Sequence, residues 1–344
     1  MAVQAIADHP ELELVGARVY NPEKVGRDAG EICGTRPLGV AATDDEEALL
    51  ALDADCVLWM GEATMFAPGE TPESGVEELC RILRSGKNVI TIVHMYFLHP
   101  GSLPDAVRIP VERACAQGGV SLHATGIDPG FNAEVLGLTL SGLCARIDEL
   151  RAREILDYGK HNNRQILFDV MGFGKPPELE SPIFGPSMRA VYGASLRLVA
   201  DGLGVAVDEV RFRRDVHVAR DAFEIPAGRI EAGTVSAMRF LFEALIDGVP
   251  RLVIEHVTRL GSDQAPHWPR GHGYSVLIKG EPSLRLELEL GEQGDRDPLY
   301  YSKTQHVAVP MRAVHSIPAV CRAEPGIRTL LELPIAPGRF CRRV

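Results

Sequence analysis

The stretch VSLHATGIDPGFNAEVLG, residues 120–137, joins a strand-like run to a helix-like run. Its first residues alternate as a short buried strand does, and Gly126 ends the alternation. Asp128 can accept the free amides at a helix start and Pro129 suits the first helical position, so we expect a helix over 130–143. Such a start, facing a cleft, would offer amides and a positive dipole end to a carboxylate or phosphate. Taken alone, the stretch is better explained as an ordinary strand–turn–helix junction. Its place between the alternating first third and the long strands that follow favours a helix start that faces a cleft.

Strand and helix patterns alternate along the chain before this junction. The expected helices are 1–8, 44–52, 105–117 and one with apolar Val76, Leu79, Ile82 and Leu83 that stops at Gly86, and the expected strands are 12–20, 40–43, 54–60 and 88–93. This alternation favours right-handed crossovers between parallel strands, with helices on both faces of the sheet. It predicts a doubly wound parallel sheet for the first third of the chain.

After the junction the pattern changes to longer strands with polar alternation. The expected strands are 147–158, 210–218, 253–260, 274–280 and 283–290, and the expected helices are 187–203, 235–248 and 309–320. Long alternating strands are typical of a mostly antiparallel sheet with one face in water. The fold class is therefore α/β. We expect a parallel-sheet domain at 1–128, an α+β domain at 129–308 and a C-terminal segment at 309–344 that returns to the first domain.

The composition is typical of a globular protein with a small-molecule partner. The 344 residues carry a formal net charge of −11, with 45% hydrophobic and 24% charged residues. An acidic chain without a basic face argues against a nucleic acid or an anionic membrane as partner. No apolar run approaches the roughly 20 residues of a membrane span and no signal peptide is recognisable, so we expect a cytoplasmic protein. The seven cysteines form no CxxC pair and are expected to be reduced.

Four segments carry a family resemblance: HPELELVGARVYNPEKVGRDAGE at 9–31, LRSGKNVITI at 83–92, TGIDPGFNAEVL at 125–136 and AVHSIPAVCRAEPGIRT at 313–329. With the domain pattern, they resemble the dihydrodipicolinate-reductase-like family of NAD(P)-dependent oxidoreductases, which includes 2,4-diaminopentanoate dehydrogenase and the native amine dehydrogenases. The resemblance covers nearly the whole chain. It implies a Rossmann-like first domain, with hydride transfer to or from a small C=O or C=N substrate between the domains.

The resemblance also implies which residues contact the cofactor. They are Tyr20, Asn21, Lys24, Gly61, Glu62, Val93, Gly126, Pro129, Gly130 and His315. The first three would border the adenosine ribose, Val93 and the residues up to Tyr96 would approach the nicotinamide, and the junction would close the pocket. The cofactor is NADP or NAD. Lys24 and Arg27 favour NADP, because NAD enzymes usually place an acidic residue after the second strand, but Glu23 leaves NAD open.

The family's first strand and its GxGxxG loop have no counterpart in this sequence, because residue 1 falls where the family's first crossover helix begins. That loop would hold the pyrophosphate at a helix start. Two interpretations stay open. The start of the coding sequence was assigned too late, which we favour, or the protein has lost dinucleotide binding.

The catalytic position also departs from the family. Amine dehydrogenases have a glutamate shortly after the fifth strand, where a carboxylate can hold a cation and move a proton. This chain has IVHMYFLHP at 92–100, without a carboxylate. An amine substrate is therefore in doubt. His94 or Tyr96 would instead donate a hydrogen bond to a carbonyl or imine as hydride arrives.

Other candidates come from residue type and place. Phe131, Tyr158 and His161 are expected to contact substrate, although a sheet edge commonly carries such residues without function. His267 and His272 lie in a Pro- and Gly-containing loop that falls short of a metal ligand set, so we expect a surface or pocket-rim loop and no metal.

Two functions remain open from the sequence. The first is an NAD(P)-dependent oxidoreductase, and the alternative is a non-enzymatic ligand-binding or dimer-forming protein that has lost dinucleotide binding. We expect a homodimer, because the exposed face of such an antiparallel sheet commonly pairs.

Overall fold

The computed structural model describes residues 1–61, 73, 75–179, 185–291 and 298–338, without the side chains of 298–303 and 305. The α-helices are α1 (Ala2–Ala7), α2 (Ala29–Ile32), α3 (Glu46–Leu50), α4 (Val76–Arg84), α5 (Asp105–Gly118), α6 (Gly137–Ser141), α7 (Pro186–Leu203) and α8 (Pro298–Val320). Shorter helical turns are η1 (Pro22–Lys24), η3 (Met95–Leu98), η4 (Pro100–Ser102), and the π-helices η5 (Asn132–Leu136) and η6 (Gln165–Val170). The strands are β1 (Cys56–Trp59), β2 (Asn88–Thr91), β3 (Ser121–Ala124), β4 (Arg146–Asp157), β5 (Glu209–Val218), β6 (Phe223–Ile225), β7 (Gly228–Ile230), β8 (Val235–Ile246), β9 (Val249–Arg259), β10 (Gly273–Glu281), β11 (Leu284–Leu288) and β12 (Gly326–Ile327).

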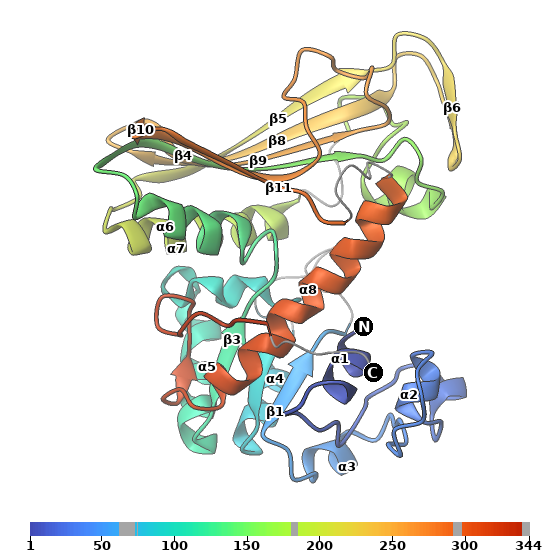
Figure 1. Ribbon diagram of the computed structural model, residues 1–344, viewed down its shortest axis with the longest axis vertical. Coiled ribbons are helices and arrows are strands. Elements are labelled where there is room, and N and C mark those ends of the chain that lie inside the picture. Colours follow the sequence, from blue (N-terminus) through green and yellow to red (C-terminus); the bar gives the residue numbers. More distant parts are fainter. Residues whose placement is uncertain (62–72, 74, 180–184, 292–297, 339–344) are drawn as a thin grey trace.

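A parallel sheet forms the first half of the molecule, in the order β1-β2-β3-β12. Val89 of β2 packs in the core that α4 and α5 cover, whereas its neighbour Ile90 packs on the other face against α8. The doubly wound prediction is thereby confirmed. The C-terminal segment contributes both β12, which pairs with β3, and α8, which runs from one sheet to the other (Figure 1).

The second sheet has six strands in the order β11-β10-β4-β9-β8-β5. The pair β4–β9 is parallel and every other neighbouring pair is antiparallel, as predicted for a mostly antiparallel sheet. Along each strand the side chains alternate between an inner face, which packs on α7 and η5, and an outer face. α6 and α7 lie between this sheet and the parallel sheet (Figure 1).

Helix α7 joins the two cores because apolar residues surround it. Met188, Tyr192, Leu196 and Val199 pack on the six-stranded sheet, and Val191, Ala194 and Leu198 pack with η3 in the core of the parallel sheet. A helix that is apolar on all sides is stable only when it is buried. Pro186 begins α7, and Gly204 ends it with a φ of +70°, which a glycine adopts at low cost.

The predicted helix at 235–248 is wrong, because this segment is the strand β8. Met238, Phe240 and Phe242 face α7 while Leu241 and Val235 are buried as well, so no polar alternation marks the strand. The informative signal is the turn that follows. Asp247 and Gly248 have φ values of +53° and +71°, which fits the two-residue hairpin loop between β8 and β9.

Three further expectations are corrected. The segments 12–20 and 40–43 are not regular strands among the described residues, since they form only isolated bridges, Arg18 with Thr43 and Ala41 with Asp28, and a strand requires a continued ladder. The helix expected over 130–143 is instead η5 followed by α6. Asp128 does not cap it, because its carboxylate turns towards His256 and Asn132, and Pro129 precedes the first helical residue.

Candidate functional site

A cluster of buried polar side chains lies where the chain crosses between the two sheets. His256 of β9 is held by Glu154 of β4, with 3.0 Å between its Nδ1 and the Glu154 Oε2. Its Nε2 lies 3.9 Å from the Oδ1 of Asp128, which follows β3. Tyr192 of α7 donates from its hydroxyl to the Asp128 carbonyl oxygen at 3.2 Å, and its ring meets His256 edge-on. Three separate elements therefore position Asp128 and His256 together.

The cluster is electrostatically unusual because it combines burial with nearby carboxylates. Burial raises the pKa of Asp128 to about 7, with Glu154 and Glu134 adding to the effect and His256 opposing it. Burial alone would lower the pKa of His256, but Asp128 and Glu154 outweigh it and the pKa is raised. A carboxyl group with a pKa near neutrality can gain and lose a proton at physiological pH.

A second buried carboxylate lies next to the first. Glu134 in η5 is fully buried, and the Ser195 hydroxyl donates to its Oε1 at 2.6 Å. Burial raises the pKa of Glu134, and Arg312 of α8 partly opposes this. The Arg312 guanidinium also lies 5.0 Å from the ring centroid of Phe131. Phe131, expected to contact substrate, therefore lies at the same crossover.

Several buried acceptor atoms in this region have no hydrogen-bond partner among the described residues. They are Asp128 Oδ1, Asn132 Oδ1, Glu134 Oε2 and Thr258 Oγ1. Buried acceptors without donors are costly, so such a group is commonly completed by a ligand or water. A cationic or N–H-bearing ligand matches the chemistry of these atoms.

The residues that the resemblance implies for the nicotinamide lie in two turns. One follows β2, and the other follows β3 and contains Asp128. The amides of Val93 and His94 both donate to Thr91 Oγ1 at 3.1 Å, which fixes the turn after β2. Across from it, Gly126 and Gly130 form a tight turn, since a Cβ on Gly130 would lie 2.4 Å from the Gly126 nitrogen. A Cβ on Gly126 would lie 3.3 Å from the Met95 side chain, so the two turns are in contact.

The two proposed proton donors differ in their surroundings. His94 is buried with its ring edge-on to Trp59, at a centroid distance of 4.7 Å. Tyr96 is buried in the apolar core of the parallel sheet. Pro129, which is predicted to contact the cofactor and not to donate a proton, is buried in the turn after β3. The catalytic roles of His94 and Tyr96 stay predictions.

The residues expected at the adenosine end lie together at an exposed edge. Tyr20 and its neighbours Asn21 and Lys24 are exposed, and the Arg18 guanidinium lies 4.9 Å from the Tyr20 ring centroid. Gly61 adjoins them, since a Cβ there would lie 2.9 Å from the Tyr20 hydroxyl. Glu62 lies outside the described residues.

Of the other predicted site residues, Tyr158 packs against Ile127, the neighbour of Asp128, whereas His315 lies beside His9. The ring of Tyr158 packs between His161 and Phe173, at centroid distances of 6.0 and 6.5 Å, and burial raises the Tyr158 pKa. His315 of α8 lies 6.2 Å from the ring of His9, beside α1. The structure thus brings His315 to the parallel sheet and Tyr158 and His161 to the end of β4.

The sequence interpretation missed most of the cluster. Asp128 was assigned to helix capping, and Asn132, Glu134, Glu154, Tyr192, Ser195, His256 and Arg312 were not singled out. One signal was present: His256 follows Leu252 and Ile254 on the inner face of β9, and a buried polar residue there requires an explanation.

Two other possibilities receive no support from the described part of the chain. None of its groups of His, Cys, Asp and Glu side chains is arranged to hold a metal ion. None of its helices is long and apolar enough to cross a membrane.

Comparison with known proteins identifies relatives of the chain. A family profile described as the 2,4-diaminopentanoate dehydrogenase C-terminal domain matches residues 131–340. An amine dehydrogenase of Streptomyces virginiae is 35% identical over 353 aligned positions, covering 100% of this chain and 96% of that protein. A 2,4-diaminopentanoate dehydrogenase of Acetoanaerobium sticklandii is 21% identical over 65% of this chain and 60% of its own length.

Solved structures show the same fold. The amine dehydrogenase of Mycobacterium smegmatis superposes with a TM-score of 0.68 at 23% identity, covering 98% of this chain and 93% of that one. Of the two functions left open by the sequence, these relationships support the enzyme. The chain belongs to the family of 2,4-diaminopentanoate dehydrogenases and amine dehydrogenases, and it is an oxidoreductase.

Proposed function

We propose that the protein is an NAD(P)-dependent amine dehydrogenase, and that Asp128, supported by His256 and Glu154, holds the nitrogen of the substrate. The observation that carries this proposal is a buried carboxyl group with a pKa of about 7, whose Oδ1 accepts no hydrogen bond from any described residue and lies 3.9 Å from the imidazole of His256. The named activity of a relative that is 35% identical over the whole chain supports the reaction class.

The absence of a carboxylate after β2 had placed an amine substrate in doubt. Asp128 supplies the missing group from the neighbouring position after β3, where the strand enters the crossover. A carboxylate there stabilises a substrate ammonium by charge and accepts its proton. His256 limits the cost of the buried negative charge, and Glu154 orients the imidazole through its Nδ1.

The overall reaction removes a hydride from the carbon that bears nitrogen and a proton from the nitrogen, and water then replaces the nitrogen to give a carbonyl compound and ammonium. A bound nicotinamide nucleotide would supply the hydride acceptor. Asp128 holds the proton that the ammonium loses, and the surrounding apolar residues exclude bulk water. Ile127, Leu156 and Tyr274 form this apolar boundary with residues of α8.

Tyr20, Asn21, Lys24 and Gly61 would hold the adenosine end of the nucleotide, and the turns at Val93 and Gly126 would hold the nicotinamide. Both NAD and NADP fit an exposed edge that contains Lys24 and Glu23. His94 would donate a hydrogen bond to the substrate or carboxamide, and Phe131 would contact the substrate.

The test compares two reactions of the full-length protein with each of the two nucleotides. We expect small aliphatic amines to reduce the oxidised nucleotide, and ketones to oxidise the reduced nucleotide only when ammonium is present. Asp128→Asn should lower the rates of both reactions about 100-fold or more, whereas Asp169→Asn, which changes an exposed carboxylate paired with Lys175, should leave them unchanged. Reduction of ketones without ammonium would instead establish the carbonyl reductase that the sequence left open.

We also propose that the chain forms a homodimer through the outer face of the six-stranded sheet. This face carries charges of both signs, with Arg151, Arg153 and Arg239 next to Glu149 and Glu255, and a self-complementary surface suits a two-fold interface. Light scattering should give the mass of a dimer at micromolar concentration. The mass of a monomer would rule the interface out.

A further inference from the structure

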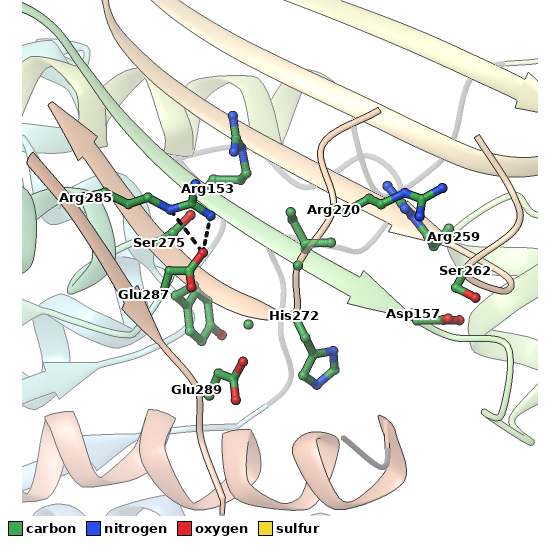
Figure 2. A pocket seen from close by; sticks show the side chains of 14 residues that line it. Arg153, Asp157, Arg259, Ser262, Arg270, His272, Ser275, Arg285, Glu287 and Glu289 are labelled. Carbon is green, nitrogen blue, oxygen red and sulfur yellow. Dashed lines mark hydrogen bonds and ion pairs between the residues drawn. The ribbon is translucent and has the colours of Figure 1, made fainter. Parts of the chain in front are cut away.

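A cavity of about 370 Å³ opens on the outer face of the six-stranded sheet, away from the Asp128 cluster. Its walls are the outer-face residues of β4, β9, β10 and β11, together with the loop between β9 and β10. Figure 2 shows Arg259, Arg270, Ser262 and Asp157 at one end, and Arg153, Arg285, Glu287 and Glu289 towards the other. The loop contains His267 and His272, for which the sequence predicts a surface or pocket-rim loop.

The two ends of this cavity differ in how their arginines are neutralised. At one end, Arg153 pairs with Glu255 and Arg285 pairs with Glu287. At the other end, no carboxylate in the described part of the chain lies within ion-pair distance of Arg259 or Arg270. The charge of Asp157 acts to raise the Arg259 pKa, but its Oδ1 accepts a hydrogen bond from the Gly159 amide at 2.8 Å.

Arg259 is the most informative residue of the cavity. It is only 4% exposed, and its Nη2 donates to the Pro269 carbonyl oxygen at 2.8 Å. Its Nε is buried without an acceptor among the described residues. Burial lowers the Arg259 pKa, and the nearby positive charge of Arg270 lowers it further. Two neighbouring guanidinium groups that form no ion pair among the described residues are costly, and an anion between them would offset that cost.

We propose that the Arg259–Arg270 end of this cavity binds a small oxyanion, either a carboxylate or a phosphate group. Two guanidinium groups provide planar, charge-assisted donors that match both oxyanions, and the Ser262 hydroxyl adds a neutral donor at the same end. The site is separate from the proposed amine site, and it opens on the sheet face that is proposed to form the dimer interface. It nevertheless shares its strands, because Glu154 and His256 face inwards while Arg153 and Arg259 face outwards on β4 and β9.

Isothermal titration calorimetry of the full-length protein tests this site with inorganic phosphate and, separately, with succinate, at an ionic strength held constant with potassium chloride. Binding of either anion is expected. Preference for phosphate would identify a phosphorylated ligand, and preference for succinate a carboxylate ligand. Arg270→Gln should raise the dissociation constant of the anion at least about tenfold, because the variant loses a charge-assisted contact.

The matched control is Arg220→Gln, which removes an exposed arginine outside the cavity and should leave binding unchanged. Arg270 is preferred over Arg259 for the test because it is exposed and anchors no backbone group, whereas Arg259 holds the loop at Pro269. The proposal is overturned if neither anion binds, or if both variants weaken binding equally. One further outcome would overturn the proposal. If the unmodified protein binds no anion and Arg270→Gln changes the oligomeric state, the arginines belong to a contact between copies of the chain.

Discussion

Two buried carboxylates on opposite faces of the six-stranded sheet have opposite electrostatic environments. Glu255, on the outer face of β9, is fully buried but accepts hydrogen bonds from Arg151, Arg153 and Arg239 at 2.7 to 3.0 Å. Burial acts to raise the pKa of Glu255, yet the three arginines outweigh it and the pKa is lowered. Asp128, against the inner face, has His256 as its neighbouring cation, and its pKa rises to about 7.

This difference distinguishes Glu255, a carboxylate that stabilises the sheet, from Asp128, the carboxylate proposed to accept a proton. Arginine stays charged at any physiological pH, so Glu255 is fixed as a carboxylate and stabilises the sheet. Histidine gains and loses a proton near neutral pH, so either member of the Asp128–His256 pair can carry the proton while the two side chains stay together. A site that handles protons needs the second arrangement, and a core ion network needs the first.

Removing the outer-face carboxylate should have the largest effect on stability. Glu255→Gln leaves three arginines around a neutral group in a buried site, and breaking a buried ion network costs about 3 to 5 kcal/mol. We expect a loss of this size in the free energy of unfolding from urea denaturation. Glu287→Gln, which removes an exposed partner of Arg285, should cost no more than about 1 kcal/mol. Equal losses in the two variants would contradict the comparison.

Removing the inner-face carboxylate should change how stability depends on pH. The Asp128 pKa is raised from 3.8 to about 7, so the folded state binds this proton more tightly and its stability declines as pH rises through that window. The raised His256 pKa acts in the same direction, because its contribution is present below 6.5 and is lost as pH rises through the folded-state value.

We therefore expect the free energy of unfolding of Asp128→Asn, minus that of the unmodified protein, to increase by on the order of 2 to 3 kcal/mol as the pH rises from 5 to 8. Urea denaturation at a series of pH values measures this difference. Asp169→Asn should show no such trend. A difference between Asp128→Asn and the unmodified protein that does not vary with pH would show that Asp128 titrates normally.

A smaller effect is expected at the neighbouring carboxylate. Ser195→Ala removes the hydroxyl that donates to Glu134, and an unsatisfied buried acceptor costs about 1 to 3 kcal/mol. Thermal unfolding should show a corresponding fall in the melting temperature. Ser102→Ala, at an exposed serine, should leave it nearly unchanged. No loss in Ser195→Ala would mean that Glu134 is satisfied in another way.

Much of the fold could be predicted from local patterns. The α7 segment carries Pro186 and Gly204 at its ends, and β9 and β10 have clear strand patterns, so their positions follow from sequence alone. β8 could not be recognised by periodicity, because it is buried on both faces and rich in residues that also form helices. The Asp247–Gly248 turn would have corrected the assignment.

The site was harder to predict than the fold. The local pattern and the resemblance both point to 120–137, and the proposed proton acceptor, Asp128, is in that stretch. The role of Asp128 depends on His256 and Tyr192, which are distant in the sequence and meet it through the packing of β9 and α7. Local rules make Asp128 before a proline a helix cap, and only the tertiary contacts show that its side chain is engaged elsewhere.

The pH dependence of amine oxidation in Asp128→Asn is the most direct test of the central claim. For the unmodified protein we expect kcat/KM to rise with pH through about 7, because the carboxyl must lose its proton before it can accept one from the substrate. Asp128→Asn should lower kcat/KM by about 100-fold or more and remove this inflection, while Asp169→Asn keeps both. An Asp128→Asn enzyme that retains its rate within a few-fold, with the same inflection, would contradict the account.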